Sequence, residues 1–276
     1  MVGAGALTVI IFTSCGDKTP PHEDYEITKS GTLINCNGKQ FNGGKPTEIQ
    51  IKGAISNVVI RNCKINGSIR TMGMSRTGEG RRLRVSSQRL GHTARAQEAA
   101  PRNVLLERLT ITSDRITSVY AGPGTTGLTL RNSTLRGTTR AVAVYLDAES
   151  ADNHITGNTF DVLGPREQIA VDGSARNTIT NNVFLTPLLG GIKLYRNCGE
   201  QGTIRHQPPS DNIIQGNTFH SDLRLNQLII VNARDSEPRR DYCDADKGKP
   251  FGSSADDRDN GVGNLVRGNR VAQPTP

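Results

Sequence analysis

The sequence contains no tryptophan, and its aromatic residues are limited to five tyrosines and six phenylalanines among 276 residues. Basic residues are therefore not interleaved with aromatic ones, which argues against a nucleic-acid-binding surface. Long apolar runs are also missing, since the apolar stretch at residues 1–14 is too short to span a bilayer comfortably. With 34% apolar residues and 30 glycines, the composition allows one sizeable domain rich in turns.

The apolar start predicts export. Residues 1–14 (MVGAGALTVIIFTS) have the character of the apolar region of a secretory signal. Thr13-Ser14-Cys15-Gly16 resembles a bacterial lipoprotein processing site, which implies lipidation of Cys15 and a periplasmic or outer-membrane protein. Residues 1–15 are then the signal segment, and residues 16–30 form a tether. The alternative is an exported protein that is cut nearby without a lipid.

Cysteine usage agrees with export. Apart from Cys15, four cysteines remain, which permits two disulfides in an oxidising compartment. Cys36 and Cys63 are 27 positions apart, and Cys198 and Cys243 flank an irregular region. Four cysteines allow three pairings. Proximity favours Cys36–Cys63 with Cys198–Cys243, and free buried thiols are the alternative.

A short pattern of Ile, Asn and Phe returns three times in the second half of the chain. The copies are Ile155-x-x-Asn158-x-Phe160, Ile179-x-x-Asn182-x-Phe184 and Ile214-x-x-Asn217-x-Phe219. The first two start 24 residues apart and the third follows after 35, while weaker copies continue to Val266. A fixed period of this size indicates one structural unit that cannot bury its apolar residues alone.

Each copy has the composition of a short strand, with alternating Val, Ile, Thr and Phe between Gly and Asn. A unit of this length without helical periodicity fits one rung of a parallel β-solenoid, in which the repeated Asn and Phe side chains stack as ladders. From about residue 30 to 272 the chain resembles the right-handed parallel β-helix (pectate-lyase-like) superfamily. We therefore expect an all-β domain at 31–276 with rungs of about 24 residues and inserted loops at 66–102, 197–210 and 233–262.

The first inserted loop is strongly basic. Residues 66–102 contain eight arginines against two glutamates, so this segment contributes +6 of the net charge of +8. Such a loop is either a solvated excursion or a wall that attracts a polyanion. Because it interrupts a strict repeat, we favour the wall.

Strand alternation places a polar cluster on the outer face of the predicted solenoid. Aligning the strands around residues 142–147, 168–172 and 191–196 directs Asp147, Asp172, Lys193 and Tyr195 outward. The candidate catalytic residues are Lys193, Tyr195, Arg196 and His206, and the candidate substrate-binding residues are Asp147, Asp172, Glu149, Arg166 and Arg205.

This cluster suits an acidic, uronate-containing polysaccharide. A lyase or C5-epimerase needs a cation to neutralise the substrate carboxylate and a base to remove the C5 proton. Arg196, Arg205 or a bound Ca²⁺ would neutralise the carboxylate, while Lys193, His206 or Tyr195 would exchange protons.

Other functions remain open. Asp147 and Asp172, one rung apart, would fit the two-carboxylate mechanism of a glycoside hydrolase or a Ca²⁺ site, and no other cofactor is indicated. The catalytic motifs of mannuronan epimerases and polygalacturonases are absent. A non-catalytic glycan-binding or envelope scaffold is the alternative to an enzyme. We expect a monomer.

Overall fold

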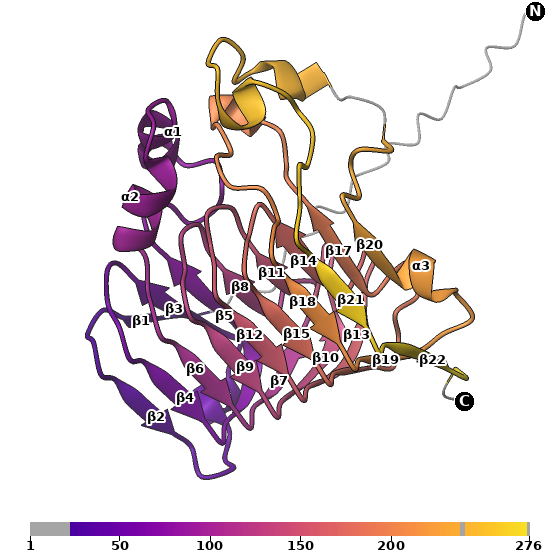
Figure 1. The fold of residues 1–276 in the computed structure, drawn as a ribbon. Coiled ribbons are helices and arrows are strands. Elements are labelled where there is room, and N and C mark those ends of the chain that lie inside the picture. Colours follow the sequence, from indigo (N-terminus) through magenta and orange to yellow (C-terminus); the bar gives the residue numbers. More distant parts are fainter. Residues whose placement is uncertain (1–22, 238–240, 275–276) are drawn as a thin grey trace, which may run out of the picture.

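The computed structural model describes residues 23–237 and 241–274 of the chain. Short strands dominate, with three α-helices in this part (Figure 1). The strands are β1 Glu23–Ile27, β2 Leu33–Asn35, β3 Thr47–Lys52, β4 Val59–Arg61, β5 Lys64–Met72, β6 Leu105–Glu107, β7 Thr110–Ser113, β8 Val119–Ala121, β9 Thr129–Arg131, β10 Thr134–Thr138, β11 Val144–Leu146, β12 His154–Thr156, β13 Thr159–Leu163, β14 Ile169–Asp172, β15 Thr178–Thr180, β16 Val183–Phe184, β17 Ile192–Tyr195, β18 Ile213–Gln215, β19 Thr218–His220, β20 Ile229–Val231, β21 Leu265–Arg267 and β22 Arg270–Ala272. The helices are α1 Arg81–Ser87, α2 His92–Glu98 and α3 Leu225–Leu228, with 3-10 turns η1 Phe41–Gly44, η2 Glu200–Gly202, η3 Asp241–Asp244 and η4 Gly252–Ser254.

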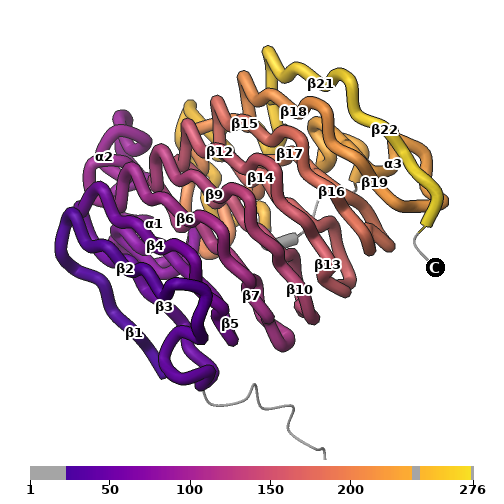
Figure 2. Tube along the Cα trace, turned by 90° about the horizontal axis from the view of Figure 1, so that it is seen from below, coloured from indigo at the N-terminus to yellow at the C-terminus, as the bar shows by residue number. Residues whose placement is uncertain are grey.

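The strands form two large all-parallel sheets, one of 14 strands and one of eight. The larger sheet has two branches that meet at the long strand β5. One branch, called the A branch below, contains β3, β5, β8, β11, β14, β17 and β20, and the other runs from β7 to β22. Repeat copies pair directly, as Ile155 with Ile179 and Ile179 with Ile214. Figure 2 shows the chain advancing steadily along one axis from indigo to yellow. This arrangement is consistent with the predicted solenoid.

The repeated Phe and Asn side chains stack as the sequence predicts. Phe160, Phe184 and Phe219 are fully buried, and neighbouring ring centroids lie 4.6 Å apart. Asn158 Nδ2 donates to Asn182 Oδ1 at 3.0 Å, and the same contact continues from Asn182 to Asn217. Each buried amide therefore has a partner one copy away, which removes the cost of an unpaired polar group.

A second asparagine ladder runs parallel to the first and was not predicted. Asn153 donates to Asn177 at 2.9 Å, Asn177 to Asn212 at 2.8 Å, and Asn212 to Asn264 at 2.9 Å. These residues precede the strands β12, β15, β18 and β21, at the turn that enters each copy. The ladders mark the two corners that bound β12, β15, β18 and β21.

Both predicted disulfides, Cys36–Cys63 and Cys198–Cys243, are present, with Cα separations of 4.8 Å and 5.0 Å. The first bridge joins neighbouring copies near the start of the fold, and the second connects two inserted segments. Two disulfides are typical of an exported protein. Among the described residues, no helix is long and apolar enough to cross a membrane.

The N-terminal boundaries differ from the prediction. Residues 1–22, including Cys15, lie outside the described residues, so the signal and the lipid site stay predictions. Part of the predicted tether is structured, because Glu23–Ile27 form β1, which pairs in parallel with β3. Ile27 is 3% exposed and joins the core, which explains why this segment is held against the fold.

The basic insertion is shorter than predicted, because β5 continues to Met72 and pairs with both β3 and β8. The remainder, residues 73–102, folds into α1 and α2, which stand out from the strands in Figure 1. Gly124 shows how closely α2 packs on the fold, since a Cβ there would lie 2.2 Å from the carbonyl oxygen of Ala96. The insertion is thus a folded segment that packs against the strands, and its attraction for a polyanion stays a prediction.

Candidate active site

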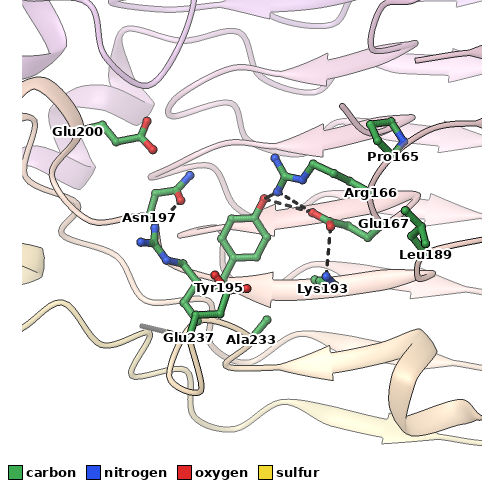
Figure 3. A pocket seen from close by; sticks show the side chains of 11 residues that line it. Pro165, Arg166, Glu167, Leu189, Lys193, Tyr195, Asn197, Glu200, Ala233 and Glu237 are labelled. Atoms are coloured by element: carbon green, nitrogen blue, oxygen red, sulfur yellow. Dashed lines mark hydrogen bonds and ion pairs between the residues drawn. The ribbon is translucent and has the colours of Figure 1, made fainter. Parts of the chain in front are cut away.

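The outer face of the A branch carries the polar side chains that strand alternation predicts. Tyr145, Ala170 and Lys193 lie in register on β11, β14 and β17, and Asp172 is level with Tyr195. A pocket of about 540 Å³ opens over β14 and β17 (Figure 3). It is lined by Pro165, Arg166, Glu167, Leu189, Lys193, Tyr195, Asn197, Glu200, Ala233, Arg234 and Glu237.

Glu167 is the centre of the charged groups in this pocket. Its carboxylate accepts a hydrogen bond of 2.9 Å from Arg166 and one of 3.3 Å from the Tyr195 hydroxyl. Lys193 Nζ lies 3.7 Å from the other carboxylate oxygen. Figure 3 shows the three side chains converging on Glu167. The side chain of Glu167 is only 1% exposed, and the two neighbouring cations Arg166 and Lys193 compensate its buried negative charge.

Tyr195 is held in its protonated form. The residue is 4% exposed, and Arg166 Nη2 donates to its oxygen at 2.8 Å. Burial, followed by the negative charges of Asp172 and Glu167, raises the pKa of Tyr195 well above its usual value. The phenol is therefore available as a proton donor at neutral pH.

Inserted segments form the opposite wall of the pocket. Arg234 donates to Asn197 Oδ1 at 2.5 Å and lies 3.6 Å and 3.5 Å from the sulfurs of Cys198 and Cys243. Glu200 stands beside Asn197 in Figure 3. Burial and then a hydrogen bond with Glu79 raise the pKa of Glu200 to about 8, so this carboxyl is mostly neutral at pH 7.

Asp147 and Asp172 do not line the pocket. Asp172 is fully buried and accepts hydrogen bonds from the Tyr145 hydroxyl at 2.6 Å and from the backbone N–H of Asn197 at 2.7 Å. Asp147 is 1% exposed and accepts a hydrogen bond from the Tyr120 hydroxyl. Both carboxylates therefore bind neighbouring protein groups beneath the surface, and they are not placed to contact a polysaccharide directly.

Arg205 supplies the positive charge beside the buried carboxylates of Asp147 and Asp172. It is 2% exposed, and its Nη1 lies 3.9 Å from Asp147 Oδ1. Burial raises the pKa of Asp147 to about 6, an effect that Arg205 opposes and the charge of Asp172 reinforces. Gly78 covers the guanidinium so closely that a Cβ there would lie 2.3 Å from Arg205 Nη1. The predicted substrate-binding Arg205 is therefore sealed under the basic insertion.

Arg196 and His206, both predicted to be catalytic, are also outside the pocket. Arg196 is 4% exposed and donates to Asp256 Oδ1 at 2.9 Å and to the carbonyl of Arg258 at 3.0 Å, which anchors the last insertion. His206 Nε2 lies 2.7 Å from the carbonyl oxygen of Ser87, and its ring packs against His92. Neither contact could be derived from strand alternation, because both partners belong to inserted segments.

Glu149, predicted to bind substrate, joins two insertions. Its carboxylate accepts the backbone N–H of His206 at 2.7 Å and the hydroxyl of Thr93 on α2. The residue is 1% exposed and does not line the pocket. Of the predicted site residues, the pocket brings together Arg166, Lys193 and Tyr195.

The predicted Ca²⁺ pair does not have the donor set of a calcium site. Both aspartates already accept hydrogen bonds from tyrosine hydroxyls, and Arg205 is the neighbouring charge of Asp147. Within residues 23–237 and 241–274, no group of three or more His, Cys, Asp or Glu side chains is arranged to hold a metal ion. Since Ca²⁺ takes six to eight oxygens, we derive no step through it.

Sequence reasoning places Glu167 beside the polar cluster, next to Arg166, but assigns it no role, and it misses the pocket role of Glu200 and Arg234. Glu167 lies just before β14 and Arg234 just after β20, and these positions at the strand ends are the sequence feature that points to them. Comparison with known proteins adds no assignment: no protein-family model, no curated protein and no solved structure matches this chain. The function must therefore be argued from the pocket itself.

Proposed function

We propose that the chain is a right-handed parallel β-helix of the pectate-lyase-like type, with rungs of about 24 residues. The parallel pairing of repeat copies and the two asparagine ladders support this proposal. We further propose that the protein is exported and anchored to a bacterial membrane through a lipid at Cys15. The two disulfides and the apolar start of the chain support export.

We propose that the pocket acts on an acidic, uronate-containing polysaccharide as a lyase. The observation that carries this proposal is the meeting of Arg166, Lys193 and Tyr195 at the single carboxylate of Glu167. Arg166 is 45% exposed at its side chain and is placed to pair with a substrate carboxylate. Neutralising that carboxylate acidifies the neighbouring C5 proton, which is the first requirement of β-elimination.

The proton transfers of an elimination can be written for these residues. Lys193 passes a proton to the carboxylate of Glu167 and, as the amine, takes the C5 proton. The C5–H electron pair forms the C4–C5 double bond as the C4–O4 bond breaks. Tyr195 gives its hydroxyl proton to the leaving O4. Because Glu167 contacts both side chains, it can return the proton from Lys193 to Tyr195 after each turnover.

The same geometry favours a lyase over a C5-epimerase. Lys193 and Tyr195 are two positions apart on β17, so their side chains leave the strand on the same face. Elimination can use a base and an acid on one side of the sugar ring, whereas epimerisation needs a proton donor on the opposite side. We therefore place elimination first.

A glycoside hydrolase is the second candidate, and a different pair of residues supports it. Glu200, with a pKa of about 8, is a neutral carboxyl suited to protonate a glycosidic oxygen. Glu167, held by Arg166 and Lys193, is the ionised carboxylate of the same pocket. This pair takes the place of Asp147 and Asp172 in the hydrolase hypothesis.

Product analysis separates these functions. Purified protein is incubated with mannuronate, guluronate, galacturonate and glucuronate polymers, and ultraviolet absorbance follows the unsaturated product. We expect a rise with at least one polymer and a loss of about a hundred-fold or more in kcat/KM in Lys193→Ala. The matched control Lys39→Ala, at an exposed position on the first turns, should keep full activity.

The other outcomes are equally informative. New reducing ends without absorbance, abolished by Glu200→Gln, would replace the lyase with the hydrolase. Polymer binding without any product would replace both with a non-catalytic glycan-binding protein.

A further inference from the structure

The basic insertion carries cations that the pocket does not use. Several of its arginines are occupied: Arg76 pairs with Glu48 at 2.6 Å, and Arg95 donates to the carbonyls of Ser86 and Leu90 at the end of α1. Arg81, Arg82 and Arg89 are exposed. In the part of the chain that the structure describes, no carboxylate pairs with these three side chains.

These arginines surround a concave surface. A pocket of about 570 Å³, separate from the first, is lined by Met74, Arg81, Arg82, Val85, Ser86, Arg89 and Arg95. Val85 is 59% exposed, so the cations flank an apolar patch. Hydrogen bonds to three backbone carbonyls hold the guanidinium of Arg95 in one orientation at the edge of this pocket.

Arg81 and Arg82 stand in the first turn of α1, where positive charge opposes the helix dipole and no acidic residue offsets it. An isolated charge run is commonly just a solvated face. Here the guanidinium groups instead line a hollow beside apolar side chains. Arginine binds carboxylates through paired N–H donors, and the apolar patch suits the C–H faces of a sugar ring.

We propose that this hollow, formed around Arg81, Arg82 and Arg89, is a second binding site for an acidic polysaccharide, outside the catalytic pocket. It shares with the proposed function only the class of ligand. Its wall is joined to the first pocket, since Arg84 donates to the carbonyl of Gln201 at 2.8 Å and Gln88 to that of Gly202 at 2.7 Å. Both backbone positions adjoin Glu200, a residue of the first pocket. A polymer held at the insertion would therefore be retained beside the site of reaction.

The test compares two triple variants of the full chain. Arg81→Ser/Arg82→Ser/Arg89→Ser removes the proposed site. Lys29→Ser/Lys39→Ser/Lys249→Ser removes the same charge from exposed positions elsewhere. Calorimetry at low salt measures the binding of polymannuronate and polygalacturonate, each as a long polymer and as a trisaccharide. Lys193→Ala is included in every protein, so that the ligand stays intact.

We expect the arginine variant to raise the Kd for long polymer about ten-fold, equivalent to about 1.4 kcal/mol, and the lysine variant to raise it less than about two-fold. Equal weakening by both variants would overturn the proposal, because diffuse charge would then explain binding. Arginine-dependent binding to anionic vesicles or duplex DNA in preference to the polymers would also overturn it. If long polymer binds through the arginines but the native protein forms no product, the lyase proposal fails while this inference stands.

Discussion

Two clusters at the outer face of the A branch contain similar side chains, but an insertion covers one of them and the other lines an open pocket. The covered part comprises Tyr120, Asp147 and Arg205, and the open part comprises Glu167, Lys193 and Tyr195. Each part pairs a tyrosine hydroxyl with a carboxylate and a cation. In the covered part Gly78 of the insertion closes over Arg205, whereas the open part lines a pocket of about 540 Å³.

The difference shows that strand position alone does not make a functional residue. Asp147 and Asp172 leave their strands in the direction that alternation predicts, yet the insertions remove them from solvent. Their chemistry then serves to hold Tyr120, Tyr145 and Asn197 in place. The same kind of cluster becomes available to a ligand only where no segment covers it.

The largest expected effect concerns the covered part. Arg205→Met should lower the free energy of unfolding by about 4 kcal/mol at neutral pH, because Asp147 and Asp172 would stay buried without their cation. Denaturant unfolding measures the loss. Arg166→Met, in the open part, removes a half-exposed cation and should cost less than about 1 kcal/mol. Equal losses in the two variants would contradict the division into covered and open parts.

The tyrosines of the two parts should differ in activity. Tyr195→Phe removes the proposed proton donor and should lower kcat about a hundred-fold. It should also lower stability by about 1 kcal/mol, because the hydroxyl bonds Arg166 and Glu167. Tyr120→Phe removes a hydroxyl that binds only Asp147 and should leave kcat within about two-fold, while lowering stability by about 1 kcal/mol. Steady-state kinetics and thermal unfolding on both variants test this contrast. A similar loss of kcat in Tyr120→Phe would place the covered part in the reaction.

The covered part should also make stability depend on pH. Burial raises the pKa of Asp147 from 3.8 to about 6, so the native state keeps a proton that the unfolded chain has already released. Stability from this group is therefore highest below pH 3.8 and falls as pH rises to about 6, by roughly 2–3 kcal/mol. Asp147→Asn should remove this decline in denaturant unfolding at a series of pH values.

Two controls make the pH experiment specific. Burial also raises the pKa of Asp259 to about 6, so Asp259 adds the same pH dependence to the stability of the unchanged protein and of Asp147→Asn. The difference between these two proteins therefore isolates the effect of Asp147. Asp152→Asn, at a carboxylate that is 51% exposed and paired with Arg176, should leave the decline in place. An unchanged decline in Asp147→Asn would mean that Asp147 is ionised without cost in the folded protein.

The repeated positions were the most predictable part of the structure. Asn158, Asn182 and Phe184 recur at a fixed spacing, and stacking of identical residues follows from parallel strands in register. Both disulfides followed from proximity along the chain and along the repeat. Within the pocket, alternation on β17 correctly placed Lys193 and Tyr195 on the outer face.

The contacts of the insertions were not predictable in this way. Arg196, His206 and Glu149 bind partners 56 to 119 positions away, which a repeat of this length does not relate. Arg234 lines the pocket with its guanidinium beside Asn197 and the Cys198–Cys243 bridge. No periodic rule connects such residues.

The strand repeat, the phenylalanine stack, the first asparagine ladder and the direction of each strand residue can be read from the sequence. They follow from local alternation and from the repeat, which act over a few residues at a time. Which outward residues stay in contact with solvent depends instead on where the insertions fold back, and this is visible only in the folded chain. Gly78 over Arg205 is the smallest example: one residue without a side chain allows a loop to seal a cation that the sequence had placed on the surface.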